Sequence, residues 1–317
     1  MDELNQTTRK DFIILGFSSF PQLEFPLFLL ILLVYLVTLS GNFVIIILVR
    51  MELSLHSPMY IFISILSCLE ILYVSVTVPK LLANLLSVDK TISYVGCFTQ
   101  LYLFHSLGIS ECMLLVMMAF DRYLAICNPL RYKTIMTNKL CILLGAFSWL
   151  IGSSSAIVLT IFTTRLPFCS YREINHFFCD LTPLVSLACS DTSVNIVLNS
   201  SFAVCLSTIP FFFICFLYIK IIIAILKIKT AEGRHKAFST CSSHLIVVTL
   251  FYGSALIVYV RPMWNIPAEY DKFLALMYTV LTPSFNPFIY SLRNNEMKGA
   301  GRNLYRKLGA DHQRLMY

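Results

Sequence analysis

Seven long apolar stretches dominate this sequence. They cover about residues 26–49, 58–82, 97–120, 140–163, 195–226, 237–260 and 273–292. A hydrocarbon core of about 30 Å needs about 20 apolar residues for each helical crossing, so each stretch is long enough to span a bilayer as an α-helix. A membrane β-barrel would instead show alternating segments of about ten residues. We therefore predict an all-α membrane protein built as a seven-transmembrane helix bundle.

The composition agrees with a bilayer as the solvent. Of the 317 residues, 57% are hydrophobic and only 13% are charged, and the mean hydropathy is +0.76. These values exclude a disordered chain and are too apolar for an ordinary soluble globule. No basic segment followed by a short apolar run precedes the first stretch, so no cleaved signal peptide is expected.

The positions of Lys and Arg predict the orientation of the bundle. The segments that follow the first, third, fifth and seventh stretches carry twice as many Lys and Arg residues as those on the opposite side. Because such residues concentrate in the cytoplasm, we predict an extracellular tail (1–25), a membrane domain (26–292) and a cytoplasmic tail (293–317). The tripeptide Asn5-Gln6-Thr7 is a glycosylation sequon on the predicted outer side, whereas use of the sequon at Asn199 is open.

Cysteines on the extracellular side predict disulfide bonds. Four of them fall there, in an oxidising compartment: Cys97, Cys169, Cys179 and Cys189. Four cysteines allow three pairings, and the residues by themselves do not choose among them. A bridge from Cys97, at the outer start of the third stretch, into the 164–194 loop would hold that loop over the mouth of the bundle.

Two carboxylates lie deep in the predicted spans, Glu70 in the second and Glu111 in the third. An acidic residue at mid-membrane costs about 2.5–3.5 kcal/mol on insertion scales, so both are expected to face the bundle interior. One interpretation is a sodium or proton site between them that includes Asn42 and Asn286. The other is a pair of protonated carboxyls that donate structural hydrogen bonds. No cofactor is expected apart from this sodium ion.

Two further patterns lie at the cytoplasmic side. Asp121-Arg122-Tyr123 ends the third stretch, where an Arg that pairs with its neighbouring Asp in one state and swings free in another supplies a two-state element. After the seventh stretch, apolar residues recur near a helical period between basic ones, which predicts a short amphipathic eighth helix on the anionic inner leaflet. A disordered basic tail is the alternative. The residues concerned are Met297, Lys298, Arg302, Leu304, Arg306, Lys307 and Leu308.

Four sequence strings indicate the class of membrane protein more closely. They are LHSPMY at residues 55–60, MAFDRYLAICNPLRY ending at Tyr132, KAFSTCSSHL at 236–245, and PSFNPFIYSLRN at 283–294. In this order they resemble the signature strings of vertebrate olfactory receptors, a family of rhodopsin-like G-protein-coupled receptors. The chain departs from that family at Glu70, where Asp is usual, and at Phe120, where Tyr is common.

The resemblance implies an odorant receptor of the ciliary plasma membrane, coupled to a stimulatory olfactory G protein and so to cyclic AMP synthesis. It implies that Arg122 engages the G protein on activation while Asp121 restrains it at rest. We expect Lys236 and residues 239–244, at the inner end of the sixth stretch, to contact or gate the G protein; a snorkelling lysine with local capping is the alternative. The resemblance also pairs Cys97 with Cys179 and Cys169 with Cys189. The residues assigned to coupling and activation are Asp121, Arg122, Tyr123, Lys236, Asn286, Pro287 and Tyr290.

An outer pocket for a small, largely apolar volatile ligand is the other implication. Helically spaced stripes occur in the third and sixth stretches, although spacing of this kind also results from plain packing, and only the resemblance assigns it to a pocket. His105, Tyr259 and Thr279 would be the polar contacts in an otherwise apolar lining. The predicted lining comprises Phe104, His105, Gly108, Ile109, Cys112, Phe202, Cys205, Leu206, Tyr252, Ala255, Leu256, Tyr259 and Thr279.

Three other functions compete with this interpretation. A channel or transporter would use the buried acids as an ion path, but the sequence shows no repeated half and no charged ring. An enzyme is not expected, because no HExxH, GxSxG or Gly-rich phosphate loop occurs. A non-olfactory chemoreceptor on the same seven-helix scaffold remains the alternative, since the site of expression is not written in the residues. Nucleic acid is not an expected partner.

Overall fold

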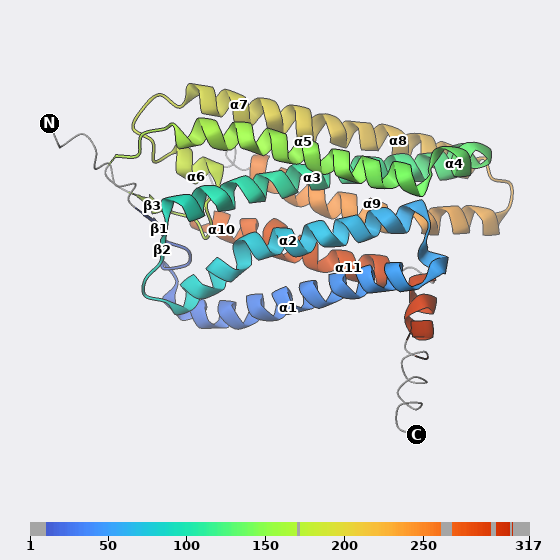
Figure 1. The fold of residues 1–317 in the computed structure, drawn as a ribbon, viewed down its shortest axis with the longest axis horizontal. Coiled ribbons are helices and arrows are strands. Elements are labelled where there is room, and N and C mark those ends of the chain that lie inside the picture. The colour runs from blue at the N-terminus through green and yellow to red at the C-terminus, as the bar shows by residue number, and fades with distance from the viewer. Residues whose placement is uncertain (1–10, 170–171, 261–267, 293–295, 305, 307–317) are drawn as a thin grey trace, which may run out of the picture.

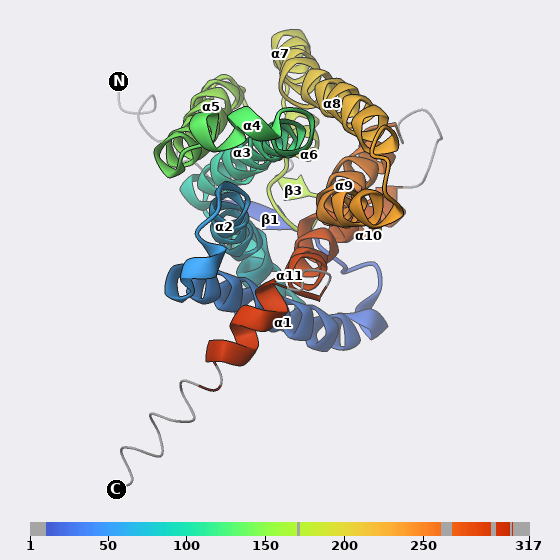
Figure 2. The same ribbon diagram turned by 90° about the vertical axis from the view of Figure 1, so that its right-hand side faces the viewer.

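A computed structural model describes residues 11–169, 172–260, 268–292, 296–304 and 306. The side chains at 236, 240, 256–260, 268–271 and 292 lie outside this description. The described chain is an elongated bundle whose long helices run side by side along its length (Figure 1). Viewed from one end, the helices form a ring, with the short strands visible at its far end (Figure 2).

Five helical segments among the described residues are long and apolar enough to cross a membrane. They are Pro21–Met51 (α1), Pro58–Leu86 (α2), Tyr94–Cys127 (α3), Asn138–Thr164 (α5) and Ser193–Leu226, which joins α7 (Ser193–Ala203), the π-turn η2 (Val204–Thr208) and α8 (Ile209–Leu226). The first five predicted stretches all lie inside these segments. The first helix begins at Pro21, five residues before its predicted start.

Two more long helical segments complete the bundle. The sixth predicted stretch lies in α9 (Ala231–Val260), and the seventh lies in a run of α10 (Ala268–Leu276), the π-turn η4 (Met277–Leu281) and α11 (Thr282–Leu292). Residues 296–304 are also helical and turn away from the end of α11 (Figure 1). Short elements occur between the long ones: η1 (Leu53–Leu55), α4 (Pro129–Ile135) and α6 (Leu181–Val185).

Helix starts follow local chemistry. Pro21, Pro58 and Pro129 lie at the first turns of α1, α2 and α4, where the missing N–H has no intrahelical partner to lose. The Ser93 hydroxyl accepts from the Gly96 N–H at the start of α3, and Thr137 does the same for Leu140 at the start of α5. Each cap satisfies one of the free donors of the first turn.

The π-turns explain how the fifth and seventh helices tolerate internal prolines. Pro210 is the second residue after η2, and Pro283 is the second residue after η4. A proline removes one backbone donor and its ring clashes with the preceding turn, and a wider turn just before the ring relieves that clash. Both helices therefore continue past their prolines without ending.

The helices approach most closely where one of them carries glycine. A Cβ at Gly152 of α5 would lie 2.2 Å from Ser110 Oγ and 2.3 Å from the Ser106 carbonyl oxygen of α3, so only glycine fits. The Ser106 and Ser153 hydroxyls are 3.1 Å apart across the same contact. Small residues and hydroxyl pairs are typical of helix contacts in lipid.

A small sheet covers the end of the bundle near the amino terminus. The strand β1 (Phe12–Ile14) lies between β2 (Thr91–Ile92), to which it is antiparallel, and β3 (Glu173–Ile174), to which it is parallel. Phe12 and Ile14 are fully buried, and Phe12 lies edge-on to Phe168 with ring centroids 5.4 Å apart. Sequence analysis did not predict this sheet.

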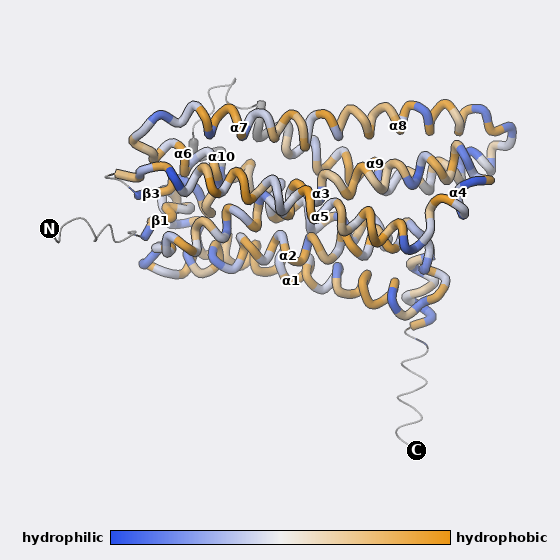
Figure 3. The backbone as a smooth tube through the Cα atoms, turned by 45° about the horizontal axis from the view of Figure 1, so that its top comes forward, coloured by the Kyte–Doolittle hydropathy of each residue, from blue (hydrophilic) through white to orange (hydrophobic). Residues whose placement is uncertain are grey.

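Hydropathy along the backbone matches a bilayer setting. Apolar residues extend along the lengths of the helices, and hydrophilic residues gather near the two ends (Figure 3). Large apolar side chains also remain exposed on outward faces, including Leu33 of α1, Leu150 of α5 and Phe212 of α8. Exposed apolar area of this extent would promote association in water, whereas lipid accommodates it.

Candidate functional site

The long helix α3 carries both halves of the candidate site. Phe104 lies toward the end covered by the sheet, and Arg122 lies toward the opposite end, where α4 and residues 296–304 are found (Figure 1). At 1.5 Å per residue, about 27 Å of helix separates the two residues. A single rigid element therefore connects the two ends of the bundle.

An aromatic cluster surrounds Phe104 at the end covered by the sheet, which is the predicted outer end. Its ring centroid lies 4.6 Å from that of Phe178, 5.0 Å from that of Tyr73 and 6.2 Å from that of Tyr278. Phe178 also contacts Phe177, at 5.0 Å between centroids. Aromatic pairs at these separations are attractive, so the loop before Cys179 forms a packed roof over this part of α3.

Two disulfide bonds hold that loop in place. Cys97 of α3 is bonded to Cys179, with Cα atoms 5.4 Å apart, and Cys169 is bonded to Cys189, with Cα atoms 6.1 Å apart. These are the two pairings that the resemblance implies. In addition, the Cys179 N–H donates to Gln100 Oε1 at 2.9 Å, so the loop is attached to α3 by both a covalent bond and a hydrogen bond.

Tyr252 of α9 forms the second part of the outer site. The residue is 7% exposed, its ring centroid lies 5.0 Å from that of Phe211, and Cys112 of α3 lies close to it. Its hydroxyl is buried beside the Cys112 thiol, which is only a weak hydrogen-bonding group, and no nitrogen or oxygen atom of the described residues pairs with it. A buried hydroxyl without a partner is costly, so this group is available to a ligand that offers one.

The three predicted polar contacts differ in whether their polar atoms already have hydrogen-bond partners. The Thr279 hydroxyl donates to the Ala275 carbonyl at 2.7 Å, so it is already engaged within its own helix. One ring nitrogen of His105, Nδ1, lies 3.0 Å from the Leu101 carbonyl, which leaves Nε2 free to face a ligand. The side chain of Tyr259 lies outside the described residues, as does that of Leu256.

The remaining predicted lining residues differ in how deeply they are buried. Gly108, Ile109, Phe202, Leu206 and Ala255 are half-buried. Phe202 packs with the outer apolar cluster below the sheet. Cys205, in the π-turn η2, is exposed and belongs to neither buried cluster of the described residues.

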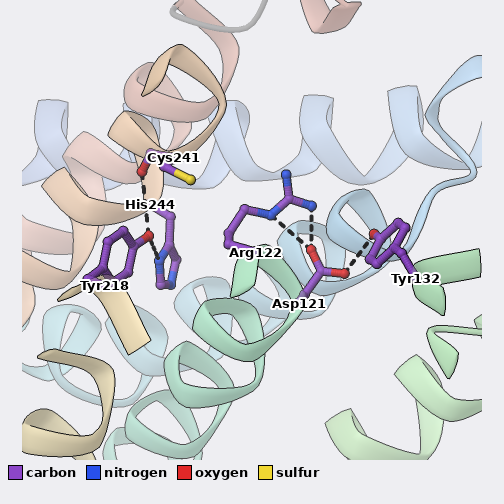
Figure 4. Close-up of polar contacts among 6 residues, drawn as sticks. All are labelled: Asp121, Arg122, Tyr132, Tyr218, Cys241 and His244. Carbon is purple, nitrogen blue, oxygen red and sulfur yellow. Dashed lines mark hydrogen bonds and ion pairs between the residues drawn. The ribbon is translucent and has the colours of Figure 1, made fainter. Parts of the chain in front are cut away.

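Asp121 is the centre of the inner site (Figure 4). Its Oδ2 accepts from Arg122 Nε at 2.9 Å and also from Arg122 Nη2, and its Oδ1 accepts from the Tyr132 hydroxyl of α4 at 2.8 Å. Burial, together with the neighbouring carboxylate of Asp121, raises the pKa of Tyr132. The phenol therefore keeps its proton and remains a donor to Asp121.

A second polar pair in the same region connects α8 to α9. The Tyr218 hydroxyl lies 2.6 Å from His244 Nδ1, and the Cys241 carbonyl oxygen accepts a hydrogen bond from it at 3.5 Å (Figure 4). Tyr218 was not predicted as a functional residue, and His244 was predicted only as part of residues 239–244. The side chain of Lys236, which the resemblance assigns to coupling, lies outside the described residues.

The buried carboxylates lie between the two ends. Glu70 Oε1 accepts from Asn286 Nδ2, while Glu70 Oε2 and Asn286 Oδ1 have no partner among the described residues. Glu111 lies close enough to act electrostatically on Glu70, and Asn42 also lies beside that carboxyl. In the part of the chain that the structure describes, no group of three or more His, Cys, Asp or Glu side chains could hold a metal ion.

The motif in the seventh helix is buried beside these acids. Pro287 packs against Gly41 of α1, where an added Cβ would lie 2.9 Å from the proline Cβ. Tyr290 is buried, and its hydroxyl has no partner within the described residues. Tyr123, the last residue of the Asp-Arg-Tyr motif, is half-buried beside Phe120, with ring centroids 6.5 Å apart.

Comparison with known proteins identifies the family. A family model described as olfactory receptor matches residues 31–307. The chain is 48% identical to olfactory receptor 6N1 of Homo sapiens, over 98% of this chain and 99% of that protein. It is 46% identical to olfactory receptor 2C1 of Mus musculus, over 98% of this chain and all of that protein. The chain belongs to the olfactory receptor family.

Membership in the olfactory receptor family confirms the resemblance noted from the signature strings. The receptor is a membrane-embedded, multi-pass protein of the G-protein-coupled class, and it is not an enzyme. Glutamate at position 70 and phenylalanine at position 120 are thus variations within a family to which the chain plainly belongs.

Proposed function

We propose that this receptor binds small, largely apolar volatile ligands in its outer transmembrane pocket and activates a stimulatory olfactory G protein, which raises cyclic AMP. The observation that carries the proposal is the build of α3. An aromatic cluster surrounds Phe104 near one end of the helix, the buried Tyr252 hydroxyl of α9 lies beside Cys112 in its middle, and Asp121 holds Arg122 near the other end.

The lining favours ligands with much apolar surface and one polar group. Phe104, Phe178 and Phe211 supply apolar contact area, which contributes about 25 cal/mol for each Å² removed from water. The Tyr252 hydroxyl and His105 Nε2 then offer a donor and an acceptor to an alcohol, aldehyde, ketone or ester. A ligand that satisfies the buried Tyr252 hydroxyl gains selectivity over a hydrocarbon of the same shape.

Coupling requires a change at the inner end. A ligand shifts the receptor only if it binds the active conformation more tightly than the resting one. We propose that α9 then moves relative to α8 and separates Tyr218 from His244, while Arg122 leaves Asp121 and becomes available to the G protein. Lys236, Tyr123 and the buried Asn286, Pro287 and Tyr290 take part in the same rearrangement.

The short helix α4 adds a contact that sequence analysis missed. Leu130 is 96% exposed there, one residue after Pro129 and two before the Tyr132 that holds Asp121. A partner that covers this exposed leucine, which lies beyond the apolar spans, removes its apolar surface from water. We assign it to G-protein contact.

The orientation follows from charge. We propose that the amino terminus is extracellular, that Asn5, which lies outside the described residues, carries glycan, and that the receptor resides in the plasma membrane of olfactory cilia. On the inner side, Met297 and Ala300 of the helix at 296–304 are buried, whereas Lys298 and Arg302 are exposed. This division of faces supports an amphipathic eighth helix on the anionic leaflet.

We also propose that Glu70 and Glu111 form a sodium or proton site. The free Oε2 of Glu70 and the free Oδ1 of Asn286 are oxygen atoms of the kind that hard cations prefer. Sodium bound at these oxygens would stabilise the conformation that holds them together, because an ion that binds only one conformation shifts the equilibrium toward it.

A cyclic AMP reporter assay over a panel of volatiles tests the proposal. The wild-type receptor is compared with Arg122→Ala, which lacks the inner cation, and with Leu130→Ala, and surface expression is measured for each. We expect ligand responses that disappear in Arg122→Ala and weaken in Leu130→Ala at equal surface expression. Full responses in Arg122→Ala would contradict the proposed coupling route.

A further inference from the structure

The helix α4 is weakly anchored to the rest of the receptor. It has seven residues, and none of their side chains is fully buried. Its side-chain hydrogen bond to the bundle runs from Tyr132 to Asp121. Isolated helices shorter than about 12 residues are marginal, so α4 can open locally at low cost and present its chain to an enzyme.

The end of α4 carries a charge pattern suited to recognition. Arg131 and Lys133 are exposed and precede the exposed Thr134 by three residues and one residue. The Thr134 hydroxyl has no hydrogen-bond partner among the residues that the structure describes. Protein kinases select substrates by charge pattern, and those with an acidic substrate groove bind such cations by charge-assisted hydrogen bonds.

Neighbouring threonines on the same face lack this combination. Thr137 is exposed, but its Oγ1 accepts from the Leu140 N–H at 3.2 Å as the cap of α5. Thr230 follows Lys227 by three residues, but its Oγ1 accepts from the Gly233 N–H at 3.3 Å at the start of α9. In both, the hydroxyl already stabilises a long helix. Thr134 follows two basic residues, is exposed, and has a hydroxyl without a hydrogen-bond partner among the described residues.

We propose that Thr134 is a phosphorylation site for a serine/threonine protein kinase that prefers basic substrates. ATP is the co-substrate. The Thr134 oxygen forms a bond to the γ-phosphorus, the bond from that phosphorus to the β–γ bridging oxygen breaks, and ADP leaves. The hydroxyl proton passes to the general base of the kinase.

The modification would act on the inner site. A phosphate adds a charge of about −1.5 to −2 in the last turn of α4, where the helix dipole disfavours negative charge. The phosphate also lies within reach of Arg131, three residues earlier on the helix. Phosphorylation therefore rearranges α4, and with it the exposed Leu130 and the bond from Tyr132 to Asp121. This consequence rests on the proposed G-protein coupling, whereas the phosphorylation itself does not.

The test uses the full-length receptor, purified in lipid nanodiscs without any G protein. It is incubated with ATP and the catalytic subunit of cyclic-AMP-dependent protein kinase, and phosphate is located by mass spectrometry. We expect phosphate at Thr134, none there in Thr134→Ala, and an initial rate about tenfold lower in Arg131→Ala, as expected for loss of one charge-assisted contact. The matched control Thr137→Ala should retain the wild-type rate at Thr134.

The outcomes are decisive in either direction. Absence of phosphate at Thr134, preferential labelling of Thr137, or an unchanged rate in Arg131→Ala would overturn the assignment. Thermal unfolding of each variant checks that the receptor remains folded. Because this readout contains no G protein, its failure leaves the proposed function intact, and a failed cyclic AMP assay would leave a positive phosphorylation result intact.

Discussion

Replacing Tyr252 by Phe removes one hydroxyl and nothing else from the proposed ligand pocket. This hydroxyl is buried beside the Cys112 thiol with no nitrogen or oxygen partner among the described residues, and burying such a group costs about 1–3 kcal/mol. Tyr252→Phe should therefore leave thermal stability unchanged or raise it. With an oxygenated ligand the hydroxyl gains a partner, so the variant loses about 0.5–1.5 kcal/mol of binding, which is about two- to thirteenfold in the half-maximal concentration.

The assay compares two agonists of similar shape, one with an oxygen function and one a hydrocarbon, in a cyclic AMP reporter assay. The variant should shift the response to the oxygenated agonist and leave the hydrocarbon response in place. Thermal unfolding of the purified receptor supplies the second readout.

Tyr35→Phe is the matched control for this experiment. The same atom is removed, but the Tyr35 hydroxyl lies 3.1 Å from Ser75 Oγ and is hydrogen-bonded to it. We expect Tyr35→Phe to reduce stability by about 0.5–1.5 kcal/mol and to leave both ligand responses unchanged. Equal loss of response to the two agonists in Tyr252→Phe, or a loss of stability as large as in Tyr35→Phe, would refute the reasoning.

Further predictions concern packing, resting state and ions. Gly152→Leu should abolish surface expression, because a Cβ there meets Ser110 Oγ at 2.2 Å. The control Gly253→Ala should be expressed normally, because its Cβ would meet nothing within 4 Å. Normal expression of Gly152→Leu would refute close packing of α3 on α5. Tyr132→Phe should raise basal cyclic AMP about two- to tenfold, because Asp121 loses a hydrogen bond worth about 0.5–1.5 kcal/mol, and unchanged basal activity would count against this restraint. Sodium should raise the unfolding temperature of the wild type but not of Glu111→Gln, and an equal sodium effect in both would leave only the structural role for these acids.

Much of the fold was predictable because a membrane span is determined by a continuous local segment of the sequence. An apolar run of about 20 residues identifies a span without reference to any other part of the chain. The three-stranded sheet was missed because its strands have only two or three residues, too few to show alternation. Its pairing also joins residues 12–14 to residues 173–174, and no local pattern encodes such a distant partner.

The candidate site divides in the same way. The motif string located Asp121 and Arg122, and the resemblance named the outer residues. The role of Tyr218 was not visible, because its partner His244 lies 26 positions away on another helix. Thr279 is a polar residue of the kind expected to contact a ligand, yet its hydroxyl donates a hydrogen bond within its own helix. Only the tertiary structure shows this.

By itself, the sequence determined that this chain is a helical membrane protein of the olfactory receptor family, since hydrophobic length and signature strings are properties of continuous segments. Tertiary structure alone decided which polar groups are satisfied and which are free. Tyr252, Thr279 and Tyr132 all carry hydroxyls on apolar helices or their ends, but one is unpaired, one is engaged in its own helix and one holds Asp121. The physical reason is that a hydrogen bond depends on what the fold places within about 3 Å.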